Sequence, residues 1–251
     1  MTGTKIFGHR GAKGSYPENT LIGFQKAIDE GVDGLEIDVH MTADGEIVVI
    51  HDERLDRTTD GDGYVKDLTL EEIKEYSAGS RFPHFRNYEA TWDIEKVPSL
   101  QEVLELLTPY DIELNIELKT NRLLYTGIEE NVLALVHQYG GDRKVIYSSF
   151  HLPTLLRLKA LDESVDIALL SREISHPYDY IQTLGLEGLH LDVNTVLSNV
   201  HQLKGIFGDL RVWTANESNE IKQLLDLNVN AIITDFPEKA AFYKSERQAY
   251  A

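Results

Sequence analysis

The 251-residue chain contains no cysteine, so it can form neither disulfides nor thiolate metal sites. Basic residues are also scarce: 24 lysine and arginine residues stand against 42 aspartates and glutamates, a formal charge of −18. We therefore expect no nucleic-acid ligand, because phosphate backbones bind to basic surfaces. The simplest role of the excess acid is solubility. One small phosphate, held by a metal ion and a few local cations, is still compatible with this composition.

Long apolar runs are missing as well. None approaches the roughly 18 residues of a membrane span, so we expect no membrane span. The first residues, Met-Thr-Gly-Thr-Lys-Ile-Phe-Gly-His, lack the charged and then apolar pattern of a secretory leader. We therefore expect a cytoplasmic protein, unless a leader has been removed. The oligomeric state cannot be predicted from these features.

Short apolar runs alternate with segments of helical periodicity along the whole chain. The clearest helical segment is 19–30, in which Leu21, Phe24 and Ile28 lie on one stripe. Eight strand–helix pairs in about 250 residues predict an α/β fold, a (β/α)8 TIM barrel that forms one domain over 1–251. The predicted strands are 5–8, 35–39, 114–118, 145–148, 166–170, 188–191, 210–213 and 231–233. The predicted helices are 19–30, 99–107, 127–139, 153–161, 177–184, 198–207, 217–227 and 237–243.

A ninth apolar run, 47–50, follows the second predicted strand after only a few residues. A parallel crossover needs about a dozen residues or more, whereas the intervening Asp44-Gly45 favours a hairpin. We therefore predict that 35–51 leaves the top of the barrel and folds back antiparallel. This return brings His51 close to Glu36 and Asp38.

Residues 52–97 are predicted to form a small insertion after the second strand. They are polar and rich in glycine, aspartate and aromatic residues. A short helix is expected over 69–76, with Thr69 and Glu72 as its capping box. The insertion is expected to lie over the C-terminal face of the barrel, because it follows a strand and precedes a helix.

Three acidic residues predict a metal site at that face. Glu36 and Asp38 are two apart in an apolar strand, so they point to the same side. Two buried acids are costly unless a positive group lies between them. Glu117, near the end of the third predicted strand, adds another carboxylate. These oxygen ligands suit a hard divalent cation, Ca²⁺ or Mg²⁺. Zinc is less favoured, because the chain has no cysteine and no close histidine pair.

Histidines and cations complete a candidate phosphoryl-transfer site. His9 and His51 end apolar runs, and an unperturbed pKa of about 6.5 suits a general acid and base near neutral pH. Arg10 and Lys119 can neutralise phosphate oxygens. Each residue alone also has a structural interpretation: Lys119, for example, could simply pair with Glu117. The whole set at one rim favours catalysis.

Several other polar and aromatic residues are assigned structural roles. Trp213 is expected to pack at the barrel mouth, although it could flank a substrate. Asp235, which precedes Phe-Pro, is expected to be a helix N-cap. Ser148 and Ser149 lack a nucleophile-elbow motif, so a serine nucleophile is not expected. Hydrogen bonding without catalysis is expected for His40, His84, His137, His151 and His176.

These motifs together resemble the glycerophosphodiester phosphodiesterase family. The resemblance runs in order from residue 9 to residue 237, and the combination of His-Arg-Gly, Glu-x-Asp and His-Asp is highly specific. The matching stretches are His9-Arg-Gly-Ala, Pro17-Glu-Asn-Thr-Leu, Leu35-Glu-Ile-Asp-Val, Thr42-Ala-Asp-Gly-Glu, His51-Asp-Glu-Arg-Leu-Asp-Arg-Thr-Thr, Val97-Pro-Ser-Leu-Gln-Glu-Val-Leu, Asn115-Ile-Glu-Leu-Lys, Ser148-Ser-Phe, Val212-Trp-Thr-Ala-Asn and Ile233-Thr-Asp-Phe-Pro.

The resemblance implies a barrel with an insertion after its second strand. It also implies metal-dependent cleavage of small-molecule glycerophosphodiesters to glycerol 3-phosphate and an alcohol. Matched by position, the acid–base pair would be His9 and His51, and Ca²⁺ or Mg²⁺ would be the usual metal. The remaining implied roles are metal binding by Glu36, Asp38 and Glu117, phosphate binding by Arg10 and Lys119, and lining of the glycerol and headgroup side by Phe150 and Trp213.

Two other functions remain open at this point. The first is a lysophospholipase D, in which aromatic residues of the insertion grip an acyl chain instead of packing the insertion's own core. The second is a phosphodiester-binding barrel without catalytic activity, although the intact acids and histidines argue against it. The attacking group is also open: it is either water or the glycerol 2-hydroxyl, which would give a cyclic phosphate. The aromatic residues concerned are Tyr64, Tyr76, Phe82, Phe85, Tyr88 and Trp92.

Overall fold

The computed structural model describes residues 3–173 and 175–249. Within them, nine strands form one sheet, and its first two strands pair so that eight parallel strands close a barrel. The predicted (β/α)8 barrel is confirmed. The strands are β1 (Lys5–His9), β2 (Gly34–Met41), β3 (Ile47–Val49), β4 (Glu113–Leu118), β5 (Val145–Ser149), β6 (Asp166–Ser171), β7 (Gly188–Asp192), β8 (Leu210–Trp213) and β9 (Ala231–Thr234).

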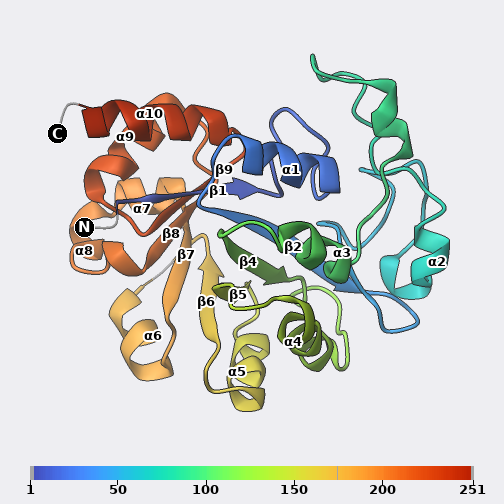
Figure 1. The fold of residues 1–251 in the computed structure, drawn as a ribbon. Coiled ribbons are helices and arrows are strands. Elements are labelled where there is room, and N and C mark those ends of the chain that lie inside the picture. The colour runs from blue at the N-terminus through green and yellow to red at the C-terminus, as the bar shows by residue number, and fades with distance from the viewer. Residues whose placement is uncertain (1–2, 174, 250–251) are drawn as a thin grey trace.

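Helices surround the barrel, and both ends of the chain lie on the same side of it (Figure 1). The α-helices are α1 (Leu21–Asp29), α2 (Leu70–Ile73), α3 (Leu100–Leu107), α4 (Ile128–Tyr139), α5 (Leu152–Leu161), α6 (Pro177–Leu184), α7 (Val193–Ser198), α8 (Val200–Leu203), α9 (Ser218–Leu227) and α10 (Pro237–Ala249). The 3-10 helices are η1 (Val65–Asp67), η2 (Ala90–Ile94) and η3 (Phe207–Asp209). No helix in the described ranges is both long and apolar enough to cross a membrane.

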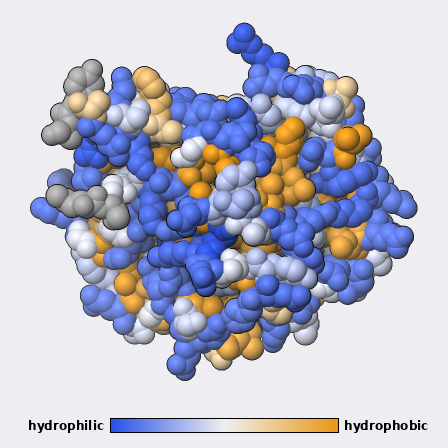
Figure 2. Space-filling model, in the orientation of Figure 1, coloured by the Kyte–Doolittle hydropathy of each residue, from blue (hydrophilic) through white to orange (hydrophobic). Residues whose placement is uncertain are grey.

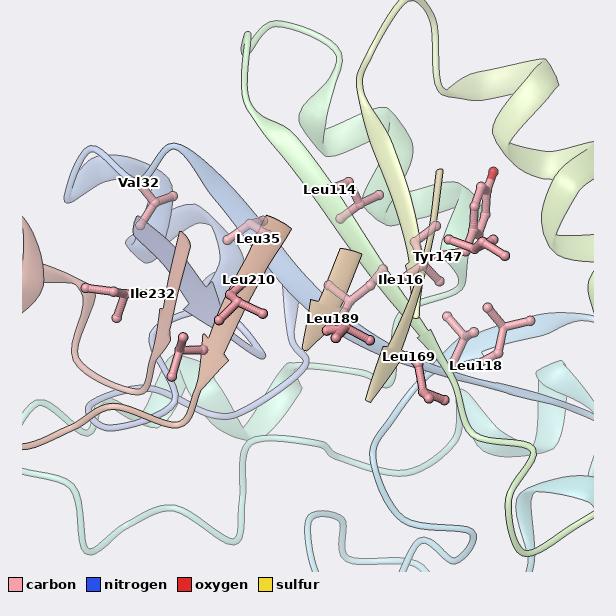
Figure 3. Packing of buried hydrophobic residues seen from close by; sticks show 14 of the residues in the cluster. Val32, Leu35, Leu114, Ile116, Leu118, Tyr147, Leu169, Leu189, Leu210 and Ile232 are labelled. Atoms are coloured by element: carbon pink, nitrogen blue, oxygen red, sulfur yellow. The ribbon is translucent and has the colours of Figure 1, made fainter. Parts of the chain in front are cut away.

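The apolar core lies between the strands and the helices. Buried parallel strands carry apolar side chains on their outer faces, and these side chains pack beneath the helices. Figure 3 shows members of this layer, among them Leu35, Ile116 and Leu189. Each fully buried leucine or isoleucine contributes about 1.5–3 kcal/mol. Because these apolar side chains on the outer faces form the core, the inner face of the barrel is available for polar residues.

The hairpin after the second strand forms as predicted. β3 pairs antiparallel with the far end of β2, with Val39 opposite Val49 and Met41 opposite Ile47. At the turn, Thr42 Oγ1 donates to Asp44 at 2.6 Å, and Gly45 has a φ of 86°. Only glycine adopts that conformation freely. The return strand therefore runs back toward the barrel and carries His51 with it.

The segment between β3 and α3 forms a lobe beside β2, coloured cyan to green in Figure 1. It has its own apolar cluster, which includes Leu55, Val65 and Ile73. The Thr69–Glu72 capping box is present, but α2 spans only Leu70–Ile73, so the predicted helix over 69–76 is too long.

Hydrophilic residues cover most of the face of the molecule shown in Figure 2, and hydrophobic residues form small separate patches on it.

The predicted helix over 198–207 is wrong. The helical region starts earlier, at α7, because the Asp192 side chain accepts from the backbone N–H groups of Asn194 and Thr195 and so caps a helix directly after β7. Asn199 interrupts the helix, and α8 ends before Gly205, whose φ is 110°. The predicted helix over 237–243 is too short, because α10 continues to Ala249. The remaining predicted helices and strands end within two residues of their expected positions.

Candidate active site

The strand register places the predicted polar residues next to one another at the C-terminal end of the barrel. His9 on β1 lies opposite Glu36 on β2. Asp38, two residues further along β2, lies opposite Glu117 on β4. All four are buried and point inward, because alternate residues of a strand share a face. This pairing, and not proximity in sequence, assembles the site.

Three carboxylates gather in this pocket. Glu36, Asp38 and Glu117 each offer an oxygen within 4.8 Å of the others, so they could hold a metal ion. Burial raises the pKa of Glu36 well above its ordinary value, and repulsion from Asp38 and Glu117 raises it further. Burial also raises the pKa of Glu117. Such mutual repulsion is relieved when a cation binds between the acids.

Two cations lie against the same acids. Lys119 Nζ donates to Glu117 Oε1 at 2.7 Å and lies 3.4 Å from Asp38 Oδ1. Arg10 Nε lies 3.1 Å from Asp38 Oδ2. Although burial opposes it, attraction to Arg10 and Lys119 holds the pKa of Asp38 well below its ordinary value. Asp38 is therefore ionised, and the two cations are fixed at the pocket wall.

A tight turn holds Arg10. Its φ is 52°, and its backbone N–H donates to Glu36 Oε2 at 3.0 Å. Gly11 follows with a φ of 85°, and a Cβ there would lie 2.7 Å from the carbonyl carbon of Gly23. A side chain at this position would therefore collide with the start of α1. Arg10 Nη1 also donates to Glu18 at 2.8 Å, which fixes the guanidinium.

His9 is paired with an acid from the last strand. Its Nδ1 lies 2.5 Å from Asp235 Oδ1, and its Nε2 lies 3.9 Å from Glu36 Oε2. Burial lowers the pKa of His9, partly offset by the hydrogen bond to Asp235. Asp235 also accepts from Asn216 Nδ2 at 2.8 Å. The predicted N-cap role of Asp235 is therefore wrong: its carboxylate faces His9 and not the start of α10.

His51 has a similar partner. Its Nδ1 lies 2.6 Å from Asp52 Oδ1, and Asp52 accepts from Arg57 Nε at 2.6 Å. The His51 carbonyl lies 3.0 Å from Nε2 of His40, whose Nδ1 lies 2.8 Å from the Tyr125 hydroxyl. His40 is thus a structural hydrogen-bonding residue, as predicted. Within the described residues, Nε2 of neither candidate catalytic histidine makes a hydrogen bond to a carboxylate.

A cavity of about 220 Å³ connects these groups. Its polar wall includes His9, Glu36 and Lys119. Phe150 and Trp213 also line the cavity, with their ring centroids 5.5 Å apart and edge to face. Trp213 Nε1 donates to the His190 carbonyl at 2.8 Å, so the indole is held in place.

The structure brings all nine predicted site residues to one rim. Eight of them line the cavity, and Asp38 lies behind them. The sequence interpretation missed four residues that complete the site: Asp235, Glu18, Arg57 and Arg172. Glu18, Arg57 and Asp235 stand inside stretches that carry the family resemblance, but no pattern within those stretches indicates which residue each of them contacts.

Comparisons with known proteins point to one family. The model of the glycerophosphoryl diester phosphodiesterase family matches residues 9–239. The chain belongs to this family. A glycerophosphodiester phosphodiesterase from Bacillus altitudinis is 40% identical over 248 residues, which cover 97% of this chain and 99% of that protein. One from Caldanaerobacter subterraneus is 37% identical and covers 94% of this chain and 95% of that protein.

Solved structures of phosphodiesterases share the fold. An Oleispira antarctica phosphodiesterase, in complex with the product sn-glycerol-3-phosphate, has a TM-score of 0.86 and 28% identity, with 97% of each chain covered. The Agrobacterium tumefaciens glycerophosphodiester phosphodiesterase has a TM-score of 0.80 and 28% identity, with 95% of this chain and 99% of that chain covered.

Proposed function

We propose that the protein hydrolyses glycerophosphodiesters to glycerol 3-phosphate and an alcohol, in a reaction that depends on a divalent metal. The observation that carries this proposal is the buried group of three carboxylates between two histidines. An acid triad, two cations and an acid–base pair are the parts that phosphodiester hydrolysis needs. The relatives' names and the glycerol 3-phosphate bound to the Oleispira enzyme support the same reaction.

The acids fit a hard divalent metal such as Ca²⁺ or Mg²⁺. The three side chains supply only oxygen ligands, which these ions prefer. Two buried oxygens at the site, Asp38 Oδ1 and Asn115 Oδ1, have no hydrogen-bond partner in the described part of the chain. Glu36, Asp38 and Glu117 would hold the ion, which would supply positive charge to stabilise the phosphate's negative charge in the transition state.

The two histidines would move the protons. A carboxylate on Nδ1 favours the tautomer in which Nδ1 carries the proton and Nε2 is a free acceptor. One histidine would then take a proton at Nε2 from the attacking hydroxyl, and the other would donate a proton from Nε2 to the leaving alcohol's oxygen. Arg10 and Lys119 would orient the phosphate. Because both cations also contact the acids, metal and phosphate sites share one charge network.

The attacking group is either water or the glycerol 2-hydroxyl. We expect ¹⁸O water to separate these routes during early turnover. A cyclic phosphate free of ¹⁸O that appears before glycerol 3-phosphate would contradict direct attack by water.

The lysophospholipase D alternative is less well supported. Four of the insertion's six aromatic residues pack against one another: Phe82 stacks on Phe85 at 5.7 Å, and Trp92 lies 6.3 Å from Phe85 and 5.7 Å from Tyr88. Tyr64 is exposed. Trp92 is almost fully buried. None of the six aromatic residues lines the active-site cavity. This packing favours the interpretation in which they form the insertion's core and not an acyl-chain channel.

A substrate panel with controlled metal content tests the proposal. EDTA-treated protein should be inactive towards glycerophosphocholine, and Ca²⁺ or Mg²⁺ should restore the release of glycerol 3-phosphate. The His9→Ala and His51→Ala variants should lose most turnover while circular dichroism shows an intact fold. If no metal supports cleavage of several glycerophosphodiesters, the non-catalytic binding barrel becomes the better interpretation.

Metal binding also has a readout that does not depend on activity. At 100 times the dissociation constant, a bound metal should stabilise the wild type by about 2.7 kcal/mol. The Asp38→Asn variant should lose that rise in melting temperature. Asp226 is an exposed acid outside the site, so Asp226→Asn is the control and should retain the rise in melting temperature with metal. An equal metal response in both variants would contradict the assignment of Asp38.

A further inference from the structure

A second hollow adjoins the active-site cavity. It measures about 200 Å³ and is lined by residues of the β3 and β4 ends, among them Asp52, Glu53 and Arg122. The two hollows share four lining residues: His51, Lys119, Phe150 and Arg172. Glu36 and Glu117 of the acid triad line only the first. A phosphodiester has two arms that leave the phosphorus in different directions, and the two hollows meet beside His51.

The acids of this second hollow are already neutralised. Asp52 is bound by Arg57 Nε at 2.6 Å and by His51. Glu53 lies 3.6 Å from Arg122, which is largely exposed. Lys119, a cation that lines both hollows, forms ion pairs with Glu117 and Asp38. The negative charge of the hollow's acids is therefore not free to attract a cationic group.

Arg172 is different, because no aspartate or glutamate within the described ranges pairs with it. Its guanidinium lies over the Trp213 ring at 5.5 Å from the centroid, and Arg172 lines both hollows. In a chain with a net charge of −18, an arginine without an acidic partner in a hollow is unusual. Arginine offers a planar set of donors that matches a carboxylate or phosphate.

We infer that the second hollow binds the leaving alcohol and that Arg172 selects alcohols carrying a negative group, a carboxylate or a further phosphate. This inference rests on the proposed function and specifies its substrate class. A cationic alcohol such as choline would meet Arg172 without a compensating acid. An uncharged alcohol would fill the hollow without the contact.

Three esters of sn-glycerol 3-phosphate test this selection, with glycolate, ethylene glycol and ethanolamine as the alcohols. These alcohols are similar in size and differ in charge. The wild type should show the highest kcat/KM for the glycolate ester and the lowest for the ethanolamine ester. In Arg172→Gln, the glycolate to ethylene glycol ratio of kcat/KM should fall about fivefold, the upper range for an exposed ion pair. Arg172→Lys should retain part of the wild-type preference for the glycolate ester.

Arg54→Gln is the matched control. Arg54 lies over the Tyr64 ring at 4.7 Å and pairs with Asp56, but lines neither hollow. Arg54→Gln loses the same charge and a similar ring contact. Its glycolate to ethylene glycol ratio of kcat/KM should therefore equal that of the wild type. A preference for the ethanolamine ester, or a ratio unchanged in Arg172→Gln, would contradict the inference while leaving the hydrolysis intact. An equal loss on all three esters would place Arg172 on the scissile phosphate instead. If none of the esters is cleaved, the proposed function itself fails.

Discussion

At the scale of single residues, the site depends on two histidine–aspartate pairs. His9 contacts Asp235 and His51 contacts Asp52, each through Nδ1. Although burial opposes it, the hydrogen bond to His9 lowers the pKa of Asp235, so the acid is ionised near neutral pH. An ionised partner holds the imidazole in one tautomer and stabilises its protonated form. We therefore propose that Asp235 is a positioning residue for His9.

We predict that Asp235→Asn lowers kcat about 100-fold or more and changes KM little, since the partner orients His9 without touching substrate. Asp235 also raises the pKa of His9, so its removal should shift the acidic limb of the pH profile to lower pH if His9 is the base. The measurement is kcat against pH. Asp162→Asn is the control, because Asp162 pairs with the exposed His137. A kcat equal to that of the wild type would contradict this role.

The residues that the sequence could predict are those in local patterns. Glu36 and Asp38 stand two apart in an apolar strand, and Glu117 and Lys119 repeat that spacing. Asp235 could not be assigned in this way, since 226 residues separate it from His9. A carboxylate before Phe-Pro resembles a helix cap in sequence. Its true contact depends on the closure of the barrel, which joins the first strand to the last.

At the scale of elements, an ion-pair network attaches the insertion to the barrel. Arg57 in the insertion donates to both oxygens of Glu18, each at 2.8 Å. Glu18 also accepts from Arg10. Although burial opposes it, hydrogen bonds from Arg57 and Arg10 lower the pKa of Glu18 to about 2. The stability this provides is present above pH 4.5 and is lost as the pH falls toward 2.

We predict that Arg57→Gln lowers kcat about tenfold, because Asp52 loses the donor that orients it toward His51. Metal-induced stabilisation should not change, since the acid triad contacts no part of Arg57. Arg54→Gln, in an exposed pair of the same insertion, should alter neither quantity. Steady-state kinetics and thermal unfolding with and without Ca²⁺ measure the two effects. Equal kinetics in the two variants would rule out this role for Arg57.

Elements with strong local signals were predictable. The Asp44-Gly45 hairpin and the Thr69–Glu72 capping box formed as expected. The helix over 198–207 was placed wrongly, because its apolar spacing is real but Asp192 caps a helix that starts five residues earlier, at Val193. An N-cap at the last residue of a strand cannot be recognised until the end of that strand is known.

At the scale of the whole molecule, the barrel interior contains a buried histidine. Neither ring nitrogen of His190 has a hydrogen-bond partner in the described ranges. Burial and the nearby Arg211 lower its pKa well below 6.5. The ring is therefore neutral in the folded protein and titrates normally when unfolded. Its contribution to stability is complete above pH 6.5 and is lost as the pH falls below that value.

We predict that replacing this ring flattens the dependence of unfolding free energy on pH. One proton taken up only on unfolding gives a slope of about 1.36 kcal/mol per pH unit. His190→Leu should remove up to that slope below pH 6.5, whereas His137→Gln, at an exposed pair, should retain it. Urea unfolding from pH 5 to 7 measures both. A slope in His190→Leu identical to the wild type would refute the prediction.

The pairing of His9 with Asp235 also constrains when the protein can become active during its own synthesis. Asp235 is added 226 residues after His9, which takes about 10–45 s at roughly 5–20 residues per second. Until then, the barrel cannot close and the first histidine lacks its carboxylate. A ribosome-bound chain therefore carries the proposed metal ligands and His51 long before it carries the His9–Asp235 pair. If His9 acts as proposed, catalysis is delayed until the last strand has been made.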